Sequence, residues 1–286
     1  MPDETMPDET MPDSTRGPQS RRVRLARAFS VSASIALVVV IAAEAVFFYR
    51  NVGDQDALAL DYRWFVGVAQ HWLDTGLFYA PRQLEGPYVV QTLVDVLYPP
   101  NALLLFVPFV WLPAVLWWLI PLGVFTYGIV RLRPARWTWP LILVCIAWPH
   151  TISQIFYGNT NMWIAAAVSA GVVWAWPGVL VLLKPSLLPF ALVGVNHRSW
   201  WLALGVLVLV SLPFGSLWPD YLTAMRNSDL GPLHALWTFP FFIAPLFAWL
   251  GRTRPDSRGR PIYRRMPSPR QFQMSTTSRP SSSSDR

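Results

Sequence analysis

The chain has 286 residues, of which 53% are hydrophobic and only 14% charged, against roughly 25% in soluble domains. Its net charge of +7 comes largely from arginines in the flanking segments 1–28 and 252–286, with long apolar runs between them. A soluble domain cannot bury such runs, and the positive-inside rule explains the arginines without a nucleic-acid partner. The composition therefore excludes an ordinary cytosolic enzyme, a disulfide scaffold and a nucleic-acid binder, and it predicts an all-α polytopic membrane protein.

Residues 1–27 precede the first apolar run. Within them, 1–15 repeat an acidic, proline-punctuated pentapeptide that predicts disorder, and a basic cytoplasmic segment follows up to Arg27. The run from Ala28 to Tyr49 is long enough to cross a membrane. Ala43-Glu44-Ala45 weakly resembles a signal-peptide cleavage site, but the run is too long and starts too late. We expect an uncleaved first span with a cytoplasmic N-terminus.

Residues 50–97 form the longest polar stretch between apolar runs and the only one rich in acids. Pieces such as Asp61 to Leu73 have a helical pattern. We therefore expect a partly helical, folded loop on the outer face.

The membrane domain, 28–251, is predicted to contain about six transmembrane helices. In the run 101–130, Pro108, Pro113 and Pro121 separate an interfacial piece from one crossing. This arrangement leaves the Arg-rich short loops and the tail 252–286, predicted to be disordered, in the cytoplasm. The later crossings are expected over 137–149, 162–176, 199–214 and 236–250, with outer segments at 150–161 and 215–235.

Residues 178–195 do not fit a crossing, because they are few and are interrupted by Lys184-Pro185 and by Pro189. Arg198 follows and favours the inside. We therefore expect a broken re-entrant segment, which is tolerated only where it is buried in protein or lines a wet cavity.

Ionisable residues within apolar runs are functional candidates, because each is costly to insert. Lys184 is the clearest case, and Pro185 beside it frees backbone carbonyls. It is interpreted as a cavity-facing cation for a phosphate or carboxylate; the alternative is a lysine that snorkels from a helix end. Glu44 lies close enough to the outer end of the first span for snorkelling to explain it.

Two polar groups on the outer face are further candidates. Asp61 lies among Tyr62, Trp64 and Phe65, a setting that suits a general base acting on a sugar hydroxyl, although surface loops contain many acids without such a role. Asn159 and Asn161 open an apolar run and are interpreted either as helix caps or as ligand-binding amides. No metal or cofactor is expected: Cys145 is the single cysteine, and no nucleotide or zinc motif is found.

Four short motifs in order resemble glycosyltransferase family 87, a family of multi-pass enzymes of the C-type superfamily that use polyprenyl-phosphate sugars. They extend over about 140 residues, and together they are moderately specific. The motifs are Asp61-Tyr62-x-x-Phe65 running on to Gly76-Leu-Phe-Tyr79, Tyr98-Pro99-Pro100, Tyr157-Gly-Asn-Thr-Asn161, and Leu183-Lys184-Pro185-Ser186 before Arg198-Ser-Trp200.

The resemblance implies transfer of a hexose, often mannose, from a polyprenyl-phosphate-sugar donor to a lipid or glycan acceptor outside a bacterial plasma membrane. By position, Asp61 would be the catalytic base, with Asp56 as its substitute if the alignment slips. Lys184 would face the donor phosphate. The sugar pocket would be shaped by Asn159, Asn161 and Tyr98, with Arg63 as a further substrate-binding candidate.

Two other functions stay open. Lys184 in a broken helix also suits a non-enzymatic transporter or flippase component, although no internal repeat apart from the N-terminal pentapeptides is found. An accessory subunit of a cell-envelope complex is the other alternative. Family members usually have more spans, so we also expect that a partner subunit could complete the lipid-binding groove.

Overall fold

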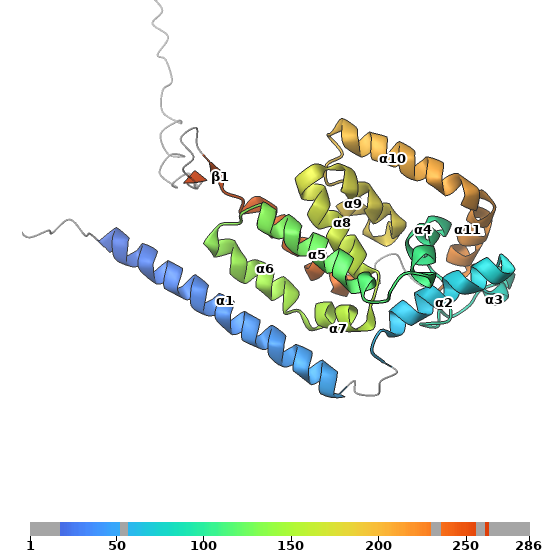
Figure 1. Cartoon of the computed structure of the whole chain (residues 1–286), viewed down its shortest axis with the longest axis horizontal. Helices are drawn as coiled ribbons and strands as arrows, with labels where there is room; N and C mark the ends of the chain where they lie inside the picture. Colours follow the sequence, from blue (N-terminus) through green and yellow to red (C-terminus); the bar gives the residue numbers. More distant parts are fainter. Residues whose placement is uncertain (1–17, 52–56, 230–235, 256–260, 263–286) are drawn as a thin grey trace, which may run out of the picture. The chain divides into compact units, whose positions relative to one another are not determined.

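A computed structural model describes residues 18–51, 57–229, 236–255 and 261–262 (Figure 1). The chain divides into two compact units, Met1–Arg252 and Thr253–Arg286. The described part of the first unit is built from helices, which confirms the predicted all-α class. In the second unit, β1 (Arg254–Pro255) and β2 (Pro261–Ile262) form a short antiparallel pair.

The first unit contains α-helices joined by short 3-10 helices, labelled η. The α-helices are α1 (Pro18–Asn51), α2 (Leu60–Thr75), α3 (Pro81–Glu85), α4 (Leu103–Phe106), α5 (Leu116–Arg131), α6 (Trp139–Ile146), α7 (Pro149–Tyr157), α8 (Asn161–Trp174), α9 (Leu188–Ala191), α10 (Arg198–Ser211), α11 (Trp218–Asn227) and α12 (Phe239–Leu250). The 3-10 helices are η1 (Pro100–Ala102), η2 (Val107–Val110), η3 (Arg136–Thr138), η4 (Trp176–Leu183), η5 (Pro185–Leu187), η6 (Leu212–Leu217) and η7 (Leu236–Thr238).

Two helical stretches of the described residues are long and apolar enough to cross a membrane. They are Arg24–Arg50 within α1, and Arg198–Asn227, which joins α10, η6 and α11. A third is present if η3, α6 and α7 count as one span bent by 61°. Apolar helices of this length fit a membrane-embedded protein. Shorter apolar helices occur at Pro100–Val110, Leu116–Arg131, Asn161–Trp174 and Phe239–Leu250.

Several predicted helix boundaries differ from those in the structure. Pro121 lies inside α5 and does not break it. The predicted crossing 137–149 bends near its end, since Trp148 has the extended backbone that is typical of the residue before a proline. The predicted outer segment 215–235 contains α11, so the chain stays helical beyond Phe214.

The first helix lies along α6 and α7 (Figure 1). Near its start, Ser30 Oγ donates a hydrogen bond of 2.7 Å to the carbonyl of Arg136. Near its end, Phe48 stacks on Phe156 with ring centroids 5.8 Å apart. The first helix and the stretch from η3 through α7 therefore run in the same direction. Glu44 is half-buried, and its Oε2 atom is buried without a hydrogen-bond partner among the described residues. Its snorkelling to the outer interface stays a prediction.

Residues 57–97 of the polar stretch are folded, and the helix predicted over Asp61 to Leu73 is confirmed as α2. Beyond α2, Arg82 Nη2 contacts the buried Asp95 Oδ2 at 2.6 Å. Tyr88 pairs with Ser228, which ties this segment to the end of α11. Stacking of Phe65 on Phe106 at 4.8 Å holds α2 against α4.

The segment 178–195 consists of η4, η5 and α9, with a break at Lys184. Its two ends pack closely: a Cβ atom added to Gly178 would lie 2.5 Å from the carbonyl oxygen of Val193. Likewise, a Cβ atom on Gly194 would lie 2.6 Å from Ala175 Cα. The segment therefore returns to the level at which it starts.

Candidate functional site

The turn between α7 and α8 is held rigidly by its neighbours. Gly158 ends α7 with a φ of 72°, and a Cβ atom there would lie 2.7 Å from the Trp118 ring and 2.8 Å from Tyr62 Cβ. The indole N–H groups of Trp117 and Trp118 donate to the carbonyls of Gly158 and Ile155, both at 2.7 Å. Carbonyl groups at a helix end need such partners, so the turn has a fixed position.

Asn159 connects this turn to α2. Its Nδ2 donates to Asp61 Oδ2 at 2.6 Å, while its Oδ1 accepts from the backbone N–H of Asn161 at 3.0 Å. The sequence left helix capping and ligand binding open for the two asparagines. The structure shows that Asn159 satisfies the start of α8 and at the same time orients a carboxylate.

Asp61 lies in the first turn of α2 and is partly exposed. Ala59, just before this helix, has a φ of 62°, and its N–H bonds to the carbonyl of Phe156, so the start of α2 is fixed to α7. Burial raises the pKa of the Asp61 carboxyl, while the Asn159 hydrogen bond and the positive charge of Lys184 lower it. Burial is the largest of these effects, so the pKa lies above its ordinary value.

Lys184 lies at the break between η4 and η5. Its Nζ donates to Asn161 Oδ1 at 2.8 Å and lies 5.4 Å from the centre of the Tyr98 ring. Asn161 is buried, and its own Nδ2 donates to Gln154 Oε1 at 2.8 Å. The ammonium group is thus held by a neutral amide and an aromatic face.

Tyr98 forms hydrogen bonds to two further segments of the site. Its hydroxyl lies 2.6 Å from Thr160 Oγ1, and its backbone carbonyl accepts a hydrogen bond from the Tyr79 hydroxyl at 2.8 Å. Both partners belong to segments that the sequence motifs include. Tyr98 is therefore fixed between the α7–α8 turn and the segment after α2.

The structure brings together five of the predicted site residues, which we name the Asp61–Lys184 cluster: Asp61, Tyr98, Asn159, Asn161 and Lys184. Arg63 is exposed on α2, and two helix positions turn it about 200° from Asp61. Asp56 lies outside the described residues.

Sequence reasoning did not select Gln154 or Thr160, although both bond to members of the cluster. Thr160 lies between Asn159 and Asn161, and this position is the sequence feature that could have identified it as a site residue. Gln154 lies in α7 among other polar residues and gave none.

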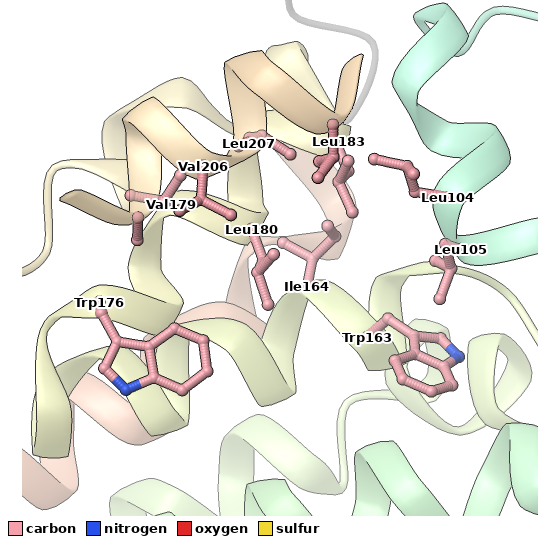
Figure 2. Close-up of a pocket in the computed structure, with 12 residues that line it drawn as sticks. Leu104, Leu105, Trp163, Ile164, Trp176, Val179, Leu180, Leu183, Val206 and Leu207 are labelled. Carbon is pink, nitrogen blue, oxygen red and sulfur yellow. The ribbon is translucent and has the colours of Figure 1, made fainter. Parts of the chain in front are cut away.

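An apolar cavity of about 520 Å³ lies next to the segment that carries Lys184. Leu183, which precedes Lys184, lines it together with residues of α4, α8 and α10. In Figure 2, the rings of Trp163 and Trp176 stand at opposite ends of the cavity, with Leu180 and Ile164 between them. A site lined in this way suits a hydrocarbon chain.

A smaller cavity of about 350 Å³ shares Leu207 with the first as a lining residue. Asn101 lines it and is buried, and its Oδ1 has no hydrogen-bond partner. An unpartnered amide oxygen makes this a polar spot in an otherwise apolar wall.

Within the described ranges, no group of three or more His, Cys, Asp and Glu side chains could hold a metal ion. Cys145 is a buried free thiol. The expectation that the protein needs no metal or cofactor stays a prediction.

No protein-family model, no curated protein and no solved structure matches this chain.

Proposed function

We propose that the protein is a membrane glycosyltransferase that moves a hexose from a polyprenyl-phosphate-sugar donor to a lipid or glycan acceptor. The observation that carries this proposal is the Asp61–Lys184 cluster, which joins a carboxylate to an ammonium group through Asn159 and Asn161. Carboxylates that act on sugars need a fixed orientation and a raised pKa, and the pKa of Asp61 is raised by burial.

In the proposed reaction, Asp61 is the base. Asn159 binds its Oδ2, and no other described residue bonds to Oδ1, which can accept the proton of the acceptor hydroxyl. The acceptor oxygen then forms the bond to the anomeric carbon while the bond from that carbon to the phosphate oxygen breaks. The electron pair leaves with the lipid phosphate, and inversion at the anomeric carbon is expected.

Lys184 stabilises the phosphate leaving group in this proposal. The Asn161 amide and the Tyr98 ring hold its ammonium group without neutralising it. Fixed positive charge at the place where negative charge develops is an effective way to lower the barrier. The isoprenoid chain of the donor would occupy the cavity shown in Figure 2, since Leu183 lines that cavity beside Lys184.

The proposed topology has six crossings and a re-entrant 178–195, with both termini in the cytoplasm of a bacterium. The close packing of Gly178 on Val193 supports the re-entrant assignment. The parallel course of α1 and the α6–α7 pair agrees with two crossings in the same direction. Asp61 would then lie at the outer face.

The test is transfer of radiolabelled sugar from polyprenyl-phosphate-mannose, and from other polyprenyl-phosphate hexoses, in membranes that contain the full chain. Asp61→Asn is expected to lower transfer by about 10²–10⁴-fold, the usual contribution of a general base. Asp74→Asn is the matched control, because Asp74 is an exposed acid on the same helix. Transfer that survives in Asp61→Asn would contradict the base assignment, and no transfer by the wild type with any donor would contradict the enzyme.

A transporter or flippase component is the second candidate, favoured by the lysine at a break between two short helices. It predicts that the protein moves a lipid-linked sugar between leaflets and forms no glycosidic bond. The Asn159 hydrogen bond to Asp61 favours the enzyme, because a transporter has no need of an oriented base.

A further inference from the structure

The end of the first unit opposite the Asp61–Lys184 cluster contains another cavity, of about 450 Å³. It lies at the C-terminal end of α8, whereas the cluster lies at the N-terminal end. With 14 residues, α8 separates the two by about 20 Å. The cavity is therefore not part of the site described above.

The described acidic residues lie away from the cavity end, whereas basic residues occur at both ends. The described acids are Glu44, Asp61, Asp74, Glu85, Asp95, Asp220 and Asp229, and they lie late in α1, in 57–97, in α11 or just after α11. The cavity end instead contains arginines at the ends of α5 and α12, at the start of α10 and in η3, namely Arg131, Arg136, Arg198 and Arg252. Pairing of Pro134 with Arg252 brings the ends of α5 and α12 together.

The cavity has an apolar wall and a polar mouth. Val172, Val193 and Leu246 line the wall, while the exposed Asn196 and His197 provide hydrogen-bonding groups. Gly171 and Gly194 also line it, and their lack of a side chain lets the backbones of Gly178 and Ala175 approach closely. Such a lining fits an amphiphile better than a soluble anion.

Two tryptophans, Trp174 and Trp249, line the cavity, and tryptophan is enriched where proteins meet the membrane–water interface. Tyr127 stacks on Trp174, with ring centroids 5.7 Å apart. The guanidinium group of Arg252 lies 4.3 Å from the centre of the Trp249 ring. Trp174 and Trp249 both line the cavity, so a cation stands directly behind one of its walls.

We infer that this cavity binds an anionic membrane phospholipid, with the phosphate at the mouth beside Asn196 and His197 and the first part of an acyl chain along the valine wall. The positive charge of Arg252, held against the Trp249 ring that lines the cavity, favours an anionic headgroup there. Positive charge beside a pocket between membrane helices favours anionic headgroups. The proposal is independent of the proposed transferase activity, since it concerns the opposite end of the unit.

The experiment is native mass spectrometry of the full chain in detergent, titrated with phosphatidylglycerol or with phosphatidylcholine of the same chains. We expect phosphatidylglycerol to bind more tightly. His197→Gln/Arg252→Gln should weaken this binding by about fivefold or more, as loss of a surface cation does. The control, His150→Gln/Arg226→Gln, removes an exposed histidine and arginine elsewhere and should bind like the wild type.

A second variant tests the wall independently of charge. Val173→Trp places a large ring in the cavity and should also weaken phosphatidylglycerol binding, with thermal unfolding measured to show that the variant is folded. Equal binding of the two lipids, or unchanged binding by both variants, would overturn the proposal. Competition by soluble glycerol phosphate at the concentration of the lipid would instead assign the cavity to a free phosphate ester and overturn the lipid assignment.

Discussion

Three effects act on the pKa of the Asp61 carboxyl. Burial raises the pKa, whereas the Asn159 hydrogen bond and the Lys184 charge lower it, and the effect of burial is the largest. A raised pKa means that the folded chain binds this proton more tightly than the unfolded chain does. The group therefore stabilises the fold at low pH, and the contribution is lost as the pH rises through the folded pKa. At neutral pH the ionised carboxylate is a cost to stability.

Asp61→Asn should therefore raise the Tm of the purified protein at pH 7 while it strongly lowers sugar transfer, since the amide keeps an oxygen for Asn159 and carries no charge. The gain should shrink as the pH falls through the raised pKa of Asp61 toward the ordinary carboxyl value. Thermal unfolding in detergent between pH 4 and pH 8 measures both effects. Asp74→Asn, on an exposed residue, should leave the Tm unchanged; a lower Tm for Asp61→Asn at pH 7 would contradict the sign.

Lys184 should set the pH at which transfer is lost on the acid side. Its charge lowers the pKa of Asp61, so Lys184→Met should raise that pKa further, and the acid limb of the pH–rate profile should move to higher pH. Lys184→Arg keeps the charge and is expected to leave the limb near its wild-type position. An unmoved limb in Lys184→Met would show that the lysine does not act on the base.

The sequence pointed to most residues of the candidate site, but it did not predict the hydrogen bonds that join them. Asp61, Lys184 and the two asparagines stood out because each is polar in an apolar or aromatic setting. Their connection through Asn159 depends on how α2 docks on the α7–α8 turn, and no local pattern encodes that docking. Arg63 had the same sequence signal as Asp61, but helix geometry turns it away.

The α7–α8 turn is the element on which the site depends, and Gly158 is its most constrained position. Gly158→Ala would force a side chain into the left-handed region and against Trp118 and Tyr62, at a cost of about 2–4 kcal/mol. Transfer should fall as well, because Asn159 follows directly. Denaturant unfolding and the transfer assay measure the two effects.

Gly67→Ala is the matched control for that variant. Gly67 lies inside α2, where an added Cβ atom meets nothing within 4 Å. Alanine is the better helix former, so this variant should be more stable by about 0.5–1 kcal/mol. If Gly158→Ala were as stable as Gly67→Ala, the turn would not be constrained as described.

Helix ends were less predictable than helices. Proline marks a break in a soluble helix, yet Pro121 and Pro245 lie inside α5 and α12, because neighbouring groups in a packed bundle can satisfy the freed carbonyls. By contrast, Pro149 does coincide with the bend between α6 and α7. The residue type is the same in each case, and the packing decides the outcome.

At the scale of the whole molecule, hydropathy predicted a helical membrane protein but not which helices cross. A helix such as α8, with 14 residues, is shorter than the roughly 20 residues that span a bilayer. Others combine only through bends or through 3-10 segments such as η6. The six-crossing topology therefore rests on the arginine pattern together with the return of 178–195, and it needs a direct test.

Cysteine accessibility provides that test, since Cys145 is the single native cysteine and is buried. In a Cys145→Ala background, Ser199→Cys should react with an impermeant maleimide only after the membrane is opened, because the re-entrant segment leaves the start of α10 inside. Thr223→Cys, exposed on α11 across the following crossing, should react on intact cells. Reaction of Ser199→Cys on intact cells would mean that 178–195 crosses the membrane, and it would move Arg198 and the cavity beside it to the outer face.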